Sequence, residues 1–409
     1  MKKLYIIIAL VLWGCAQMAS AQNMYREYQT GYHPRTVVSV VHSNGYVYIF
    51  QADGPSYLSV TEIDPLNMLP TGNDKSFIIN QQSRIVYLNG GFEDANGDFV
   101  LFGYMLESFN IFNPQYPTYI KIKQNLSSCE VYYELIPYGE ITAGCDGYDL
   151  NAGEVYMFVN GRELSVVEPS SPTSIHRLMM NTTSNPNDYF TDISWDSVHE
   201  KFIATGSAWN TSTGHECPFV EVFELLNDTI IVPVAEYYID NQPLLYSSEY
   251  KSLHVQLDNN NLMVYHDLRR RDGQDTYDNI WLTRINNFWD FNIASVTESR
   301  IYELANAKLM AKDMVYDPYN NRLNFLGVFS FNKNLQILAQ TNPYSLSSGM
   351  DIGQLGIGFN VNSTIINPQD PYIPLYANDF EMFNLALDIY NPCYPVLIEG
   401  SINIAGNLF

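Results

Sequence analysis

The sequence predicts an all-β fold in which one unit of antiparallel strands recurs along the chain. Three observations predict it. Aromatic residues make up 14% of the 409 residues and include 31 Tyr, a composition that favours strands over helices. Short runs that alternate apolar and polar residues are separated by turn residues. Similar hairpin patterns then return along most of the chain, which indicates a repeat architecture.

The first 21 residues are predicted to be an export signal rather than part of the fold. Lys2 and Lys3 precede a short apolar run, and Ala19–Ala21 (Ala-Ser-Ala) matches the small-residue cleavage pattern. Residues 22–409 then form a single domain. A second interpretation stays open, because Leu12–Cys15 resembles a bacterial lipobox that would attach a lipid to Cys15. Either way we expect an exported protein that is periplasmic, extracellular or associated with the outer membrane.

The charge balance restricts the partners of this chain. It has 44 acidic and 21 basic residues, a net charge of −23, and loss of two Lys with the signal would give −25. A strongly negative surface repels nucleic acid and anionic lipid, so we expect neither as a partner. A protein or glycan ligand remains compatible, and a membrane contact is expected only through a lipid on Cys15. No cofactor is expected.

In chain order, the first three units each contain a hairpin. The first runs from Val37 to Phe50 around Asn44-Gly45, the strongest short hairpin signal. The second runs from Arg84 to Met105 around Asn96-Gly97. The third runs from Ile141 to Val159, and Asn160-Gly161 leads at once into a further strand, which makes a meander.

Three more units follow. In the fourth, Asp192–Ala208 predicts two strands joined by a polar turn, with Phe219–Phe223 and Ile230–Val234 as the third and fourth strands. The fifth hairpin is centred on Leu257–Met263, and the sixth spans Met314–Phe325. After Gly349 the pattern fades.

An Asp recurs at the turn of these units, at positions 94, 149, 196, 258 and 317, with Ser43 in its place in the first unit. The intervals range from 47 residues (Asp149 to Asp196) to 62 residues (Asp196 to Asp258), which is the length that four short strands and their loops require. Each carboxylate is expected to accept backbone N–H groups two residues on and so hold the turn.

These hairpins, with their drifting spacing, resemble β-propeller repeat proteins in general, although no narrower propeller family is indicated. The resemblance implies six blades, or seven if the tail forms a sheet of its own, and a ring closed by the N- and C-terminal segments. Asp196-Ser197-Val198 and Asp228-Thr229-Ile230 resemble a short O-glycosylation motif of Bacteroidetes. With the Ala-Gln signal junction, the chain therefore resembles a secreted protein of that phylum.

Cysteines and possible metal ligands leave further alternatives open. Cys129, Cys145, Cys217 and Cys393 allow three pairings, of which Cys129 with Cys145 is the nearest in sequence; free buried thiols are the alternative. His254 and His266 would face each other across a hairpin if the loop between them is odd-numbered, but no third ligand is visible. Asp94-x-Asn96-x-Asp98 copies the start of a calcium loop, yet a plain turn explains it. We predict no metal site.

Two sets of residues are candidates for ligand binding. Trp209 is expected to be exposed, because polar loop residues surround it, and could stack on a sugar ring. Arg269, Arg270 and Arg271 form the one basic cluster, which could bind acidic groups, although neighbouring Asp residues can also neutralise it.

Function is less constrained than fold, because no strong catalytic motif is present. The leading hypothesis is an exported binding protein that presents propeller loops to a protein or glycan. The alternative is a glycan-active hydrolase or lyase with carboxylates near the propeller axis, since two carboxylates suffice for glycosidic cleavage.

Overall fold

A computed structural model of the chain describes most of the predicted strands. The described residues are 36–53, 57–64, 69–79, 85–106, 115–133, 141–149, 153–160, 163–170, 175–179, 189–227, 230–239, 246–247, 252–272, 275–303, 309–317, 322–329, 334–341, 343–346, 350–352, 358–360 and 403–404. Cys15, Asp228, Cys393 and the predicted signal lie outside them. Within these ranges we find no helical stretch with the length and hydropathy needed to cross a membrane.

The described strands form six antiparallel sheets in chain order, which we name A to F. Sheet A holds β1 (Thr36–Val41), β2 (Val47–Asp53), β3 (Tyr57–Asp64), β4 (Leu69–Pro70) and β5 (Lys75–Ile78). Sheet B holds β6 (Ile85–Glu93), β7 (Phe99–Leu106), β8 (Gln115–Ile122) and β9 (Cys129–Tyr133). Sheet C holds β10 (Ala143–Asp149), β11 (Gly153–Asn160), β12 (Glu163–Val167) and β13 (Ile175–Met179).

Sheet D holds β14 (Tyr189–Asp196), β15 (Lys201–Asn210), β16 (His215–Leu226) and β17 (Ile230–Tyr238). Sheet E holds β18 (Tyr246–Ser247), β19 (Ser252–Asp258), β20 (Asn261–Asp272), β21 (Asp275–Asn286) and β22 (Ser295–Glu303). Sheet F holds β23 (Leu309–Asp317), β24 (Arg322–Phe329), β25 (Asn334–Thr341), β26 (Met350–Ile352), β27 (Gly358–Asn360) and β28 (Asn403–Ile404). The all-β prediction and all six predicted hairpins are confirmed.

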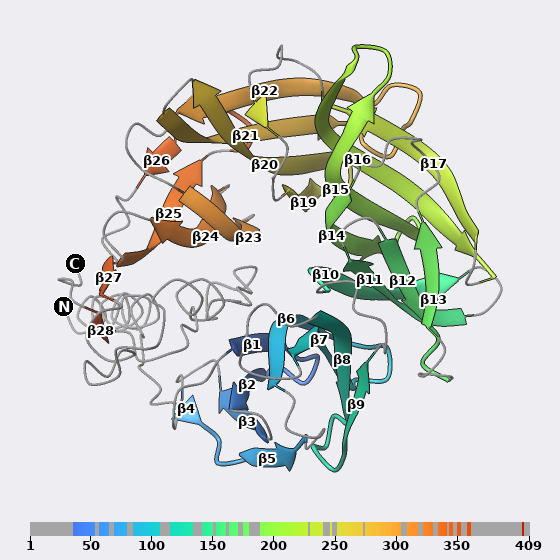
Figure 1. Cartoon of the computed structure of the whole chain (residues 1–409), viewed down its shortest axis with the longest axis vertical. Coiled ribbons are helices and arrows are strands. Elements are labelled where there is room, and N and C mark those ends of the chain that lie inside the picture. The colour runs from blue at the N-terminus through green and yellow to red at the C-terminus, as the bar shows by residue number, and fades with distance from the viewer. Residues whose placement is uncertain are drawn as a thin grey trace, which may run out of the picture.

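The sheets are arranged around a common axis, with β1, β6, β10, β14, β19 and β23 nearest to it (Figure 1). These six strands also contact one another in chain order, from β1 with β6 to β19 with β23. Each sheet therefore packs face to face against the next, which is a propeller-like arrangement.

Apolar layers fill the spaces between neighbouring sheets, because alternate residues of a strand point to opposite faces. In sheet D, Phe202 packs in the layer shared with sheet C, whereas the next residue, Ile203, packs in the layer shared with sheet E. Other such layers lie between sheets A and B and between sheets B and C. A strand covered on both faces has no solvated side, and all eight residues of β7 are buried.

The recurring Asp holds the turn after the first strand, as predicted, at Asp94, Asp196 and Asp258; the turns after Asp149 and Asp317 lie outside the described residues. Asp94 Oδ1 accepts the backbone N–H of Asn96 at 2.9 Å, and Asp258 Oδ1 accepts that of Asn260 at 2.7 Å. In the first unit the structure corrects the alignment. There His42 Nδ1, not Ser43, accepts the N–H two residues on, from Asn44 at 3.0 Å. An imidazole nitrogen supplies the acceptor that a carboxylate supplies in the other turns.

A β-bulge opposite a glycine recurs in the first strands of sheets B, D and F. The pairing shifts at Leu88/Gly90, Phe190/Asp192 and Ala311/Asp313, and the residues across from these shifts are Gly103, Gly206 and Gly327. A Cβ on Gly206 would lie 1.9 Å from the carbonyl oxygen of Tyr189. The bulge therefore requires the glycine.

The bulged residue binds the next sheet. Asn89 of sheet B donates its side-chain N–H to Ile141 O at 2.8 Å, just before sheet C begins. Thr191 of sheet D donates its hydroxyl to Ser252 O of sheet E at 2.7 Å and accepts the Ser252 N–H at 2.8 Å. The first strands of sheets A and C pair without such a shift.

The predicted bridge between Cys129 and Cys145 is wrong. Both carry free thiols in the structure. Cys129 packs between sheets A and B, whereas Cys145 packs between sheets C and D, so the two side chains lie in separate layers. Burial raises the pKa of Cys129 to about 12, which leaves its thiol protonated and unreactive.

Candidate functional site

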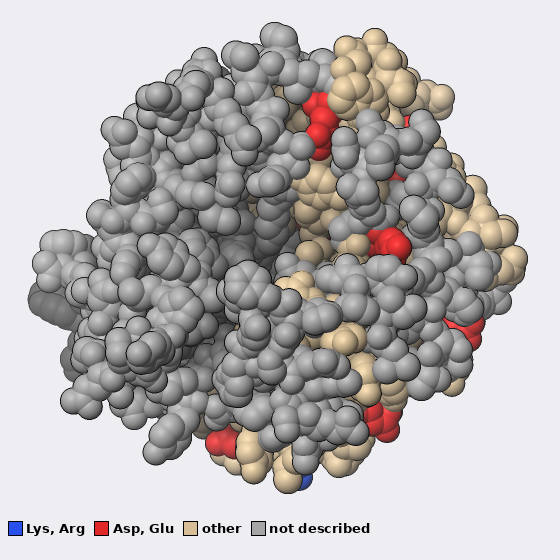
Figure 2. Space-filling view, in the orientation of Figure 1, with Lys and Arg blue, Asp and Glu red and all other residues tan. Residues whose placement is uncertain are grey.

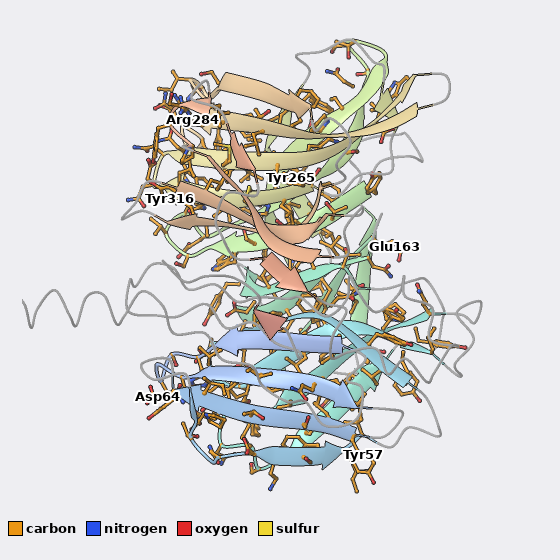
Figure 3. The ribbon with its side chains drawn as sticks, turned by 90° about the vertical axis from the view of Figure 1, so that its left-hand side faces the viewer. Tyr57, Asp64, Glu163, Tyr265, Arg284 and Tyr316 are labelled. Carbon is orange, nitrogen blue, oxygen red and sulfur yellow. The ribbon has the colours of Figure 1, made fainter. Side chains whose placement is uncertain are left out.

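Loops from successive sheets gather at two opposite ends of the molecule. The first-turn end carries the turns after the first and third strands of each sheet, and the second-turn end carries the turns after the second strands. Figure 3 shows Asp64, Arg284 and Tyr316 toward the first-turn end and Tyr57 and Glu163 toward the other. On the face in Figure 2, Asp and Glu recur among the coloured residues while almost no Lys or Arg is visible.

The predicted ligand-binding residues lie at the second-turn end of adjacent sheets. Trp209 is half-buried and belongs to strand β15 rather than to a loop, which corrects the sequence prediction. Its backbone pairs with Glu216, next to the terminal pair Asn210 and His215. Arg269, Arg270 and Arg271 belong to β20, and Arg271 pairs with Thr276 next to the terminal pair of that hairpin. Trp209 and Arg271 thus hold equivalent positions in sheets D and E.

A buried ionic cluster connects sheets B and C at the first-turn end. Lys121 Nζ lies 2.8 Å from Asp94 Oδ2, and the Tyr156 hydroxyl donates to the same oxygen at 2.5 Å. Burial alone would raise the pKa of Asp94, but the hydrogen bonds from Lys121 and Tyr156 outweigh it and hold that pKa below its usual value.

The calcium-like motif is thereby explained as a turn. Asp94 is occupied by Lys121, and Asp98 is bound by Lys123 Nζ at 2.7 Å. Within the described part of the chain, no group of three or more His, Cys, Asp or Glu residues has the arrangement of a metal site.

Asp146 is a second unusual carboxyl group near this cluster. It belongs to β10, one of the strands nearest the axis. Burial, together with the charges of Glu154, Asp94 and Glu93, raises the pKa of Asp146 to about 6. A carboxyl group that keeps its proton near pH 6 can act as a general acid.

The most catalytic-like geometry lies between sheets D and E. The Ser194 hydroxyl lies 2.6 Å from His254 Nε2, and Asp192 Oδ2 lies 3.0 Å from His254 Nδ1. Asp192 Oδ2 also accepts the backbone N–H of His254 at 3.0 Å, and the Thr205 hydroxyl lies 3.2 Å from Nδ1. The two ring nitrogens of His254 therefore have different partners, as in a nucleophile–base–carboxylate arrangement.

The predicted facing of His254 and His266 is wrong. Asp258 pairs with Asn261 across a two-residue turn, so the odd-numbered loop that this facing required is not formed. With the further shift at Gln256/Asp258, His254 pairs with Val264 and His266 pairs with Ser252. Ser252 Oγ contacts His266 Nδ1 deep in the same layer. Burial lowers the pKa of His266 to about 3, so this ring is neutral at ordinary pH.

Sequence reasoning singled out His254 but missed Ser194 and Asp192. One signal was available, because Asp192 and Ser194 are two residues apart and so share one face of a strand. That this face meets His254 depends on sheet order, which no local pattern encodes.

Comparisons with known proteins give no family assignment. No protein-family model matches the chain, and no curated protein matches it significantly. Solved structures similar to it include a periplasmic gluconolactonase of Pseudomonas aeruginosa, with 9% identity and a TM-score of 0.44 over 71% of this chain and 81% of that one. A protein from Lactobacillus plantarum has 8% identity and a TM-score of 0.47 over 82% and 89%.

A third similar structure is an α-L-arabinofuranosidase, Arb93A of Fusarium graminearum, with 9% identity and a TM-score of 0.40 over 82% of this chain and 84% of that one. All three TM-scores are below 0.5, and all three identities are below a tenth. Neither an activity nor a substrate for this chain follows from them.

Proposed function

We propose that the protein is an exported binding protein that holds a protein or glycan ligand at the second-turn end of sheets D and E. The observation that supports this most is the equivalent placement of Trp209 and Arg271, each one pair before the turn of its hairpin. An indole can stack on a sugar ring, and arginine forks bind carboxylate or sulfate groups. Such a pair suits a glycan with acidic substituents or an acidic protein segment.

The ligand surface would belong to one exported domain. We propose that residues 1–21 are removed on export and that residues 22–409 form one closed propeller of six blades. The six sheets of similar topology and the contacts between successive first strands support the ring. The signal pattern, the alternative lipid anchor at Cys15 and the resemblance to secreted Bacteroidetes proteins belong to the same proposal.

A glycan array on the purified protein, followed by calorimetry with the best ligand, tests the binding function. Trp209→Ala should weaken binding about tenfold, the equivalent of one good stacking contact. Substituting Arg269, Arg270 and Arg271 by Gln should remove the preference for acidic ligands. Phe291→Ala, at the opposite end and 40% exposed, is the control and should leave affinity unchanged. Equal affinities for wild type and Trp209→Ala would contradict this surface.

The glycan-active hydrolase or lyase is a second proposal, supported by the raised pKa of Asp146 on a strand near the axis. Asp146 would donate a proton to the leaving oxygen, and a neighbouring carboxylate would assist. A screen for release of reducing sugar tests it. Asp146→Asn should abolish release and Asp74→Asn, on the surface of sheet A, should preserve it. Full activity in the Asp146→Asn variant would contradict the role of Asp146 as the acid of a hydrolase or lyase.

A further inference from the structure

Two strands near the axis, β14 and β19, bring the side chains of a serine, a histidine and an aspartate together. The Ser194 Oγ to His254 Nε2 distance is 2.6 Å, and the His254 Nδ1 to Asp192 Oδ2 distance is 3.0 Å. We infer that Ser194 is a nucleophile that hydrolyses carboxylic esters, with His254 as its base. The binding proposal does not enter this inference, because Trp209 lies at the opposite end of sheet D.

The partners of His254 define the tautomer that this chemistry needs. A carboxylate accepts hydrogen bonds and donates none, so Asp192 Oδ2 favours a proton on Nδ1, and the Thr205 hydroxyl, 3.2 Å from Nδ1, can also accept from that N–H. Nε2 is then the acceptor and faces the hydroxyl of Ser194. The Asp192 oxygen also accepts the His254 backbone N–H, which fixes the carboxylate against the strand that carries the base.

The side chains of His254, Asp192 and Ser194 are buried to different degrees. The His254 side chain is 2% exposed, which keeps water from competing for its ring nitrogens. The Asp192 side chain is 22% exposed, and Ser194 is also only partly buried. Ser194 is therefore not sealed inside the layer, while the base stays shielded from water.

Apolar side chains are exposed at the end of sheets D and E that lies nearer to Ser194, which suggests an ester with an apolar group. Val198 lies in the turn after β14, and Phe291 and Ile293 lie in the turn after β21, at the first-turn end of the same two sheets. All three are well exposed, at 73%, 40% and 58%. The rings of His199 and Trp289 stack at 4.0 Å and hold these two turns side by side. Apolar side chains so placed can bind an acyl chain.

The reaction balances with water as the one co-reactant. Ser194 Oγ forms a bond to the ester carbonyl carbon while its proton passes to His254 Nε2. The bond to the alkoxy oxygen breaks, and that oxygen takes the proton from Nε2 and leaves as an alcohol. Water, deprotonated by Nε2, then attacks the acyl carbon, the bond to Ser194 Oγ breaks, and the serine regains its proton.

Other contacts between the same strands show what a purely structural link looks like here. The Thr191 hydroxyl binds the backbone C=O and N–H of Ser252, and Asp196 accepts from the Gln256 side chain at 2.5 Å. Ser252 and His266 form a serine–histidine contact in which the serine is 0% exposed. Ser194 differs from Ser252 because it is only partly buried and because a carboxylate lies beside its histidine.

A fluorophosphonate probe on the purified full-length chain tests the inference. The probe phosphonylates an activated serine, and peptide mass spectrometry should place the adduct on Ser194 of the wild type. Ser194→Ala should lose the adduct and at least 90% of p-nitrophenyl butyrate hydrolysis, and Asp192→Asn should slow labelling at least tenfold. Ser212→Ala, an exposed serine at the other end of sheet D, is the matched control and should label like the wild type.

The wild-type adduct keeps the test decisive even if a variant fails to fold. An adduct on Ser194 together with ester hydrolysis supports the inference. Absence of an adduct from the folded wild type, or an adduct at another residue, overturns it and leaves the cluster as a link between sheets. Glycan binding by Trp209 would be unaffected by either result, so the two proposals fail separately.

Discussion

At the scale of single residues, the turn carboxylates do more than the sequence indicated. The local pattern predicted that Asp94 would cap its own turn, and it does. Its second oxygen binds Lys121 and Tyr156, which come from another strand and another sheet. A turn is encoded within five residues and can be predicted, whereas a partner 62 positions away depends on how two sheets face each other.

Because Asp94 binds groups from another strand and another sheet, removal of its buried carboxylate should destabilise the folded protein. Asp94→Ala leaves Lys121, 14% exposed, without its closest counter-charge, and should lower the free energy of unfolding by about 3 kcal/mol. Urea unfolding followed by tryptophan fluorescence measures it. Lys123→Ala removes a side chain that is 52% exposed and should cost less than about 1 kcal/mol. Equal losses in the two variants would contradict the importance of burial.

The raised pKa of Asp146 gives a stability that depends on pH. Its pKa is about 6 in the folded chain against an ordinary value of 3.8, so the folded state gains a proton first as pH falls. The resulting stabilisation is complete below about pH 4 and is lost as pH rises through 6. Asp146→Asn cannot ionise and should be more stable than wild type at pH 7.5 by up to about 3 kcal/mol.

At pH 4 the Asp146→Asn variant and the wild type should unfold at nearly the same urea concentration. Asp74→Asn, on an exposed residue, is the control and should shift neither midpoint. A gain of stability in Asp146→Asn at pH 4 that equals its gain at pH 7.5 would show that packing, not ionisation, is responsible.

At the scale of strands and turns, periodicity predicted where the hairpins lie but not their bulges. Asn96-Gly97 forms a turn and Asp192–Ala208 forms part of a hairpin, as expected. Both could be predicted because turn chemistry and the alternation of apolar and polar residues depend only on residues close in sequence. A bulge is a mismatch between two strands, so it cannot be read from one of them. His254 and His266 do not face each other because the turn between Asp258 and Asn261 has two residues, an even number, and the shift at Gln256/Asp258 then moves the register by one more residue.

The bulge in sheet D predicts that Gly206 does not tolerate substitution by a residue with a Cβ atom. A Cβ on Gly206 would meet the Tyr189 carbonyl oxygen at 1.9 Å and the Phe190 Cα at 2.7 Å, both backbone atoms that cannot rotate away. Gly206→Ala should therefore destabilise the protein by about 3 kcal/mol. Gly214→Ala is the control, because its φ is +76 but no atom lies within 4 Å of its Cβ, and it should cost about 1 kcal/mol. Thermal unfolding of both variants distinguishes the two costs.

At the scale of the whole molecule, sheet order places the candidate site. Sequence spacing predicted the number of units, yet Ser194, Asp192 and His254 meet only because sheets D and E pack face to face. The same logic extends to the ends of the chain. Sheets B and D each bind the start of the following sheet through a bulged residue, and sheet F has the same bulge with Gly327 opposite it.

A closed ring predicts that sheet F binds the start of sheet A in this way. Thr36, the first residue of β1, would then lie beside the bulged residue Lys312, as Ser252 lies beside Thr191. The pair Thr36→Cys with Lys312→Cys should form a disulfide on oxidation and raise the melting temperature. Thr36→Cys with Asn324→Cys, on the second strand of sheet F, should not form one. Failure of the first pair to crosslink would contradict closure.

The bulges also mark a longer internal period. They lie five residues before Asp94, Asp196 and Asp317, in every second sheet, whereas β1 and β10 pair regularly and the shift in β19 sits beside its turn. This alternation divides the chain into three tandem modules of two sheets each, in which the second sheet carries the bulge. Duplication or deletion of one sheet would place two sheets with a bulge, or two sheets without one, next to each other. Shortened or lengthened versions of this protein should therefore be built in whole modules.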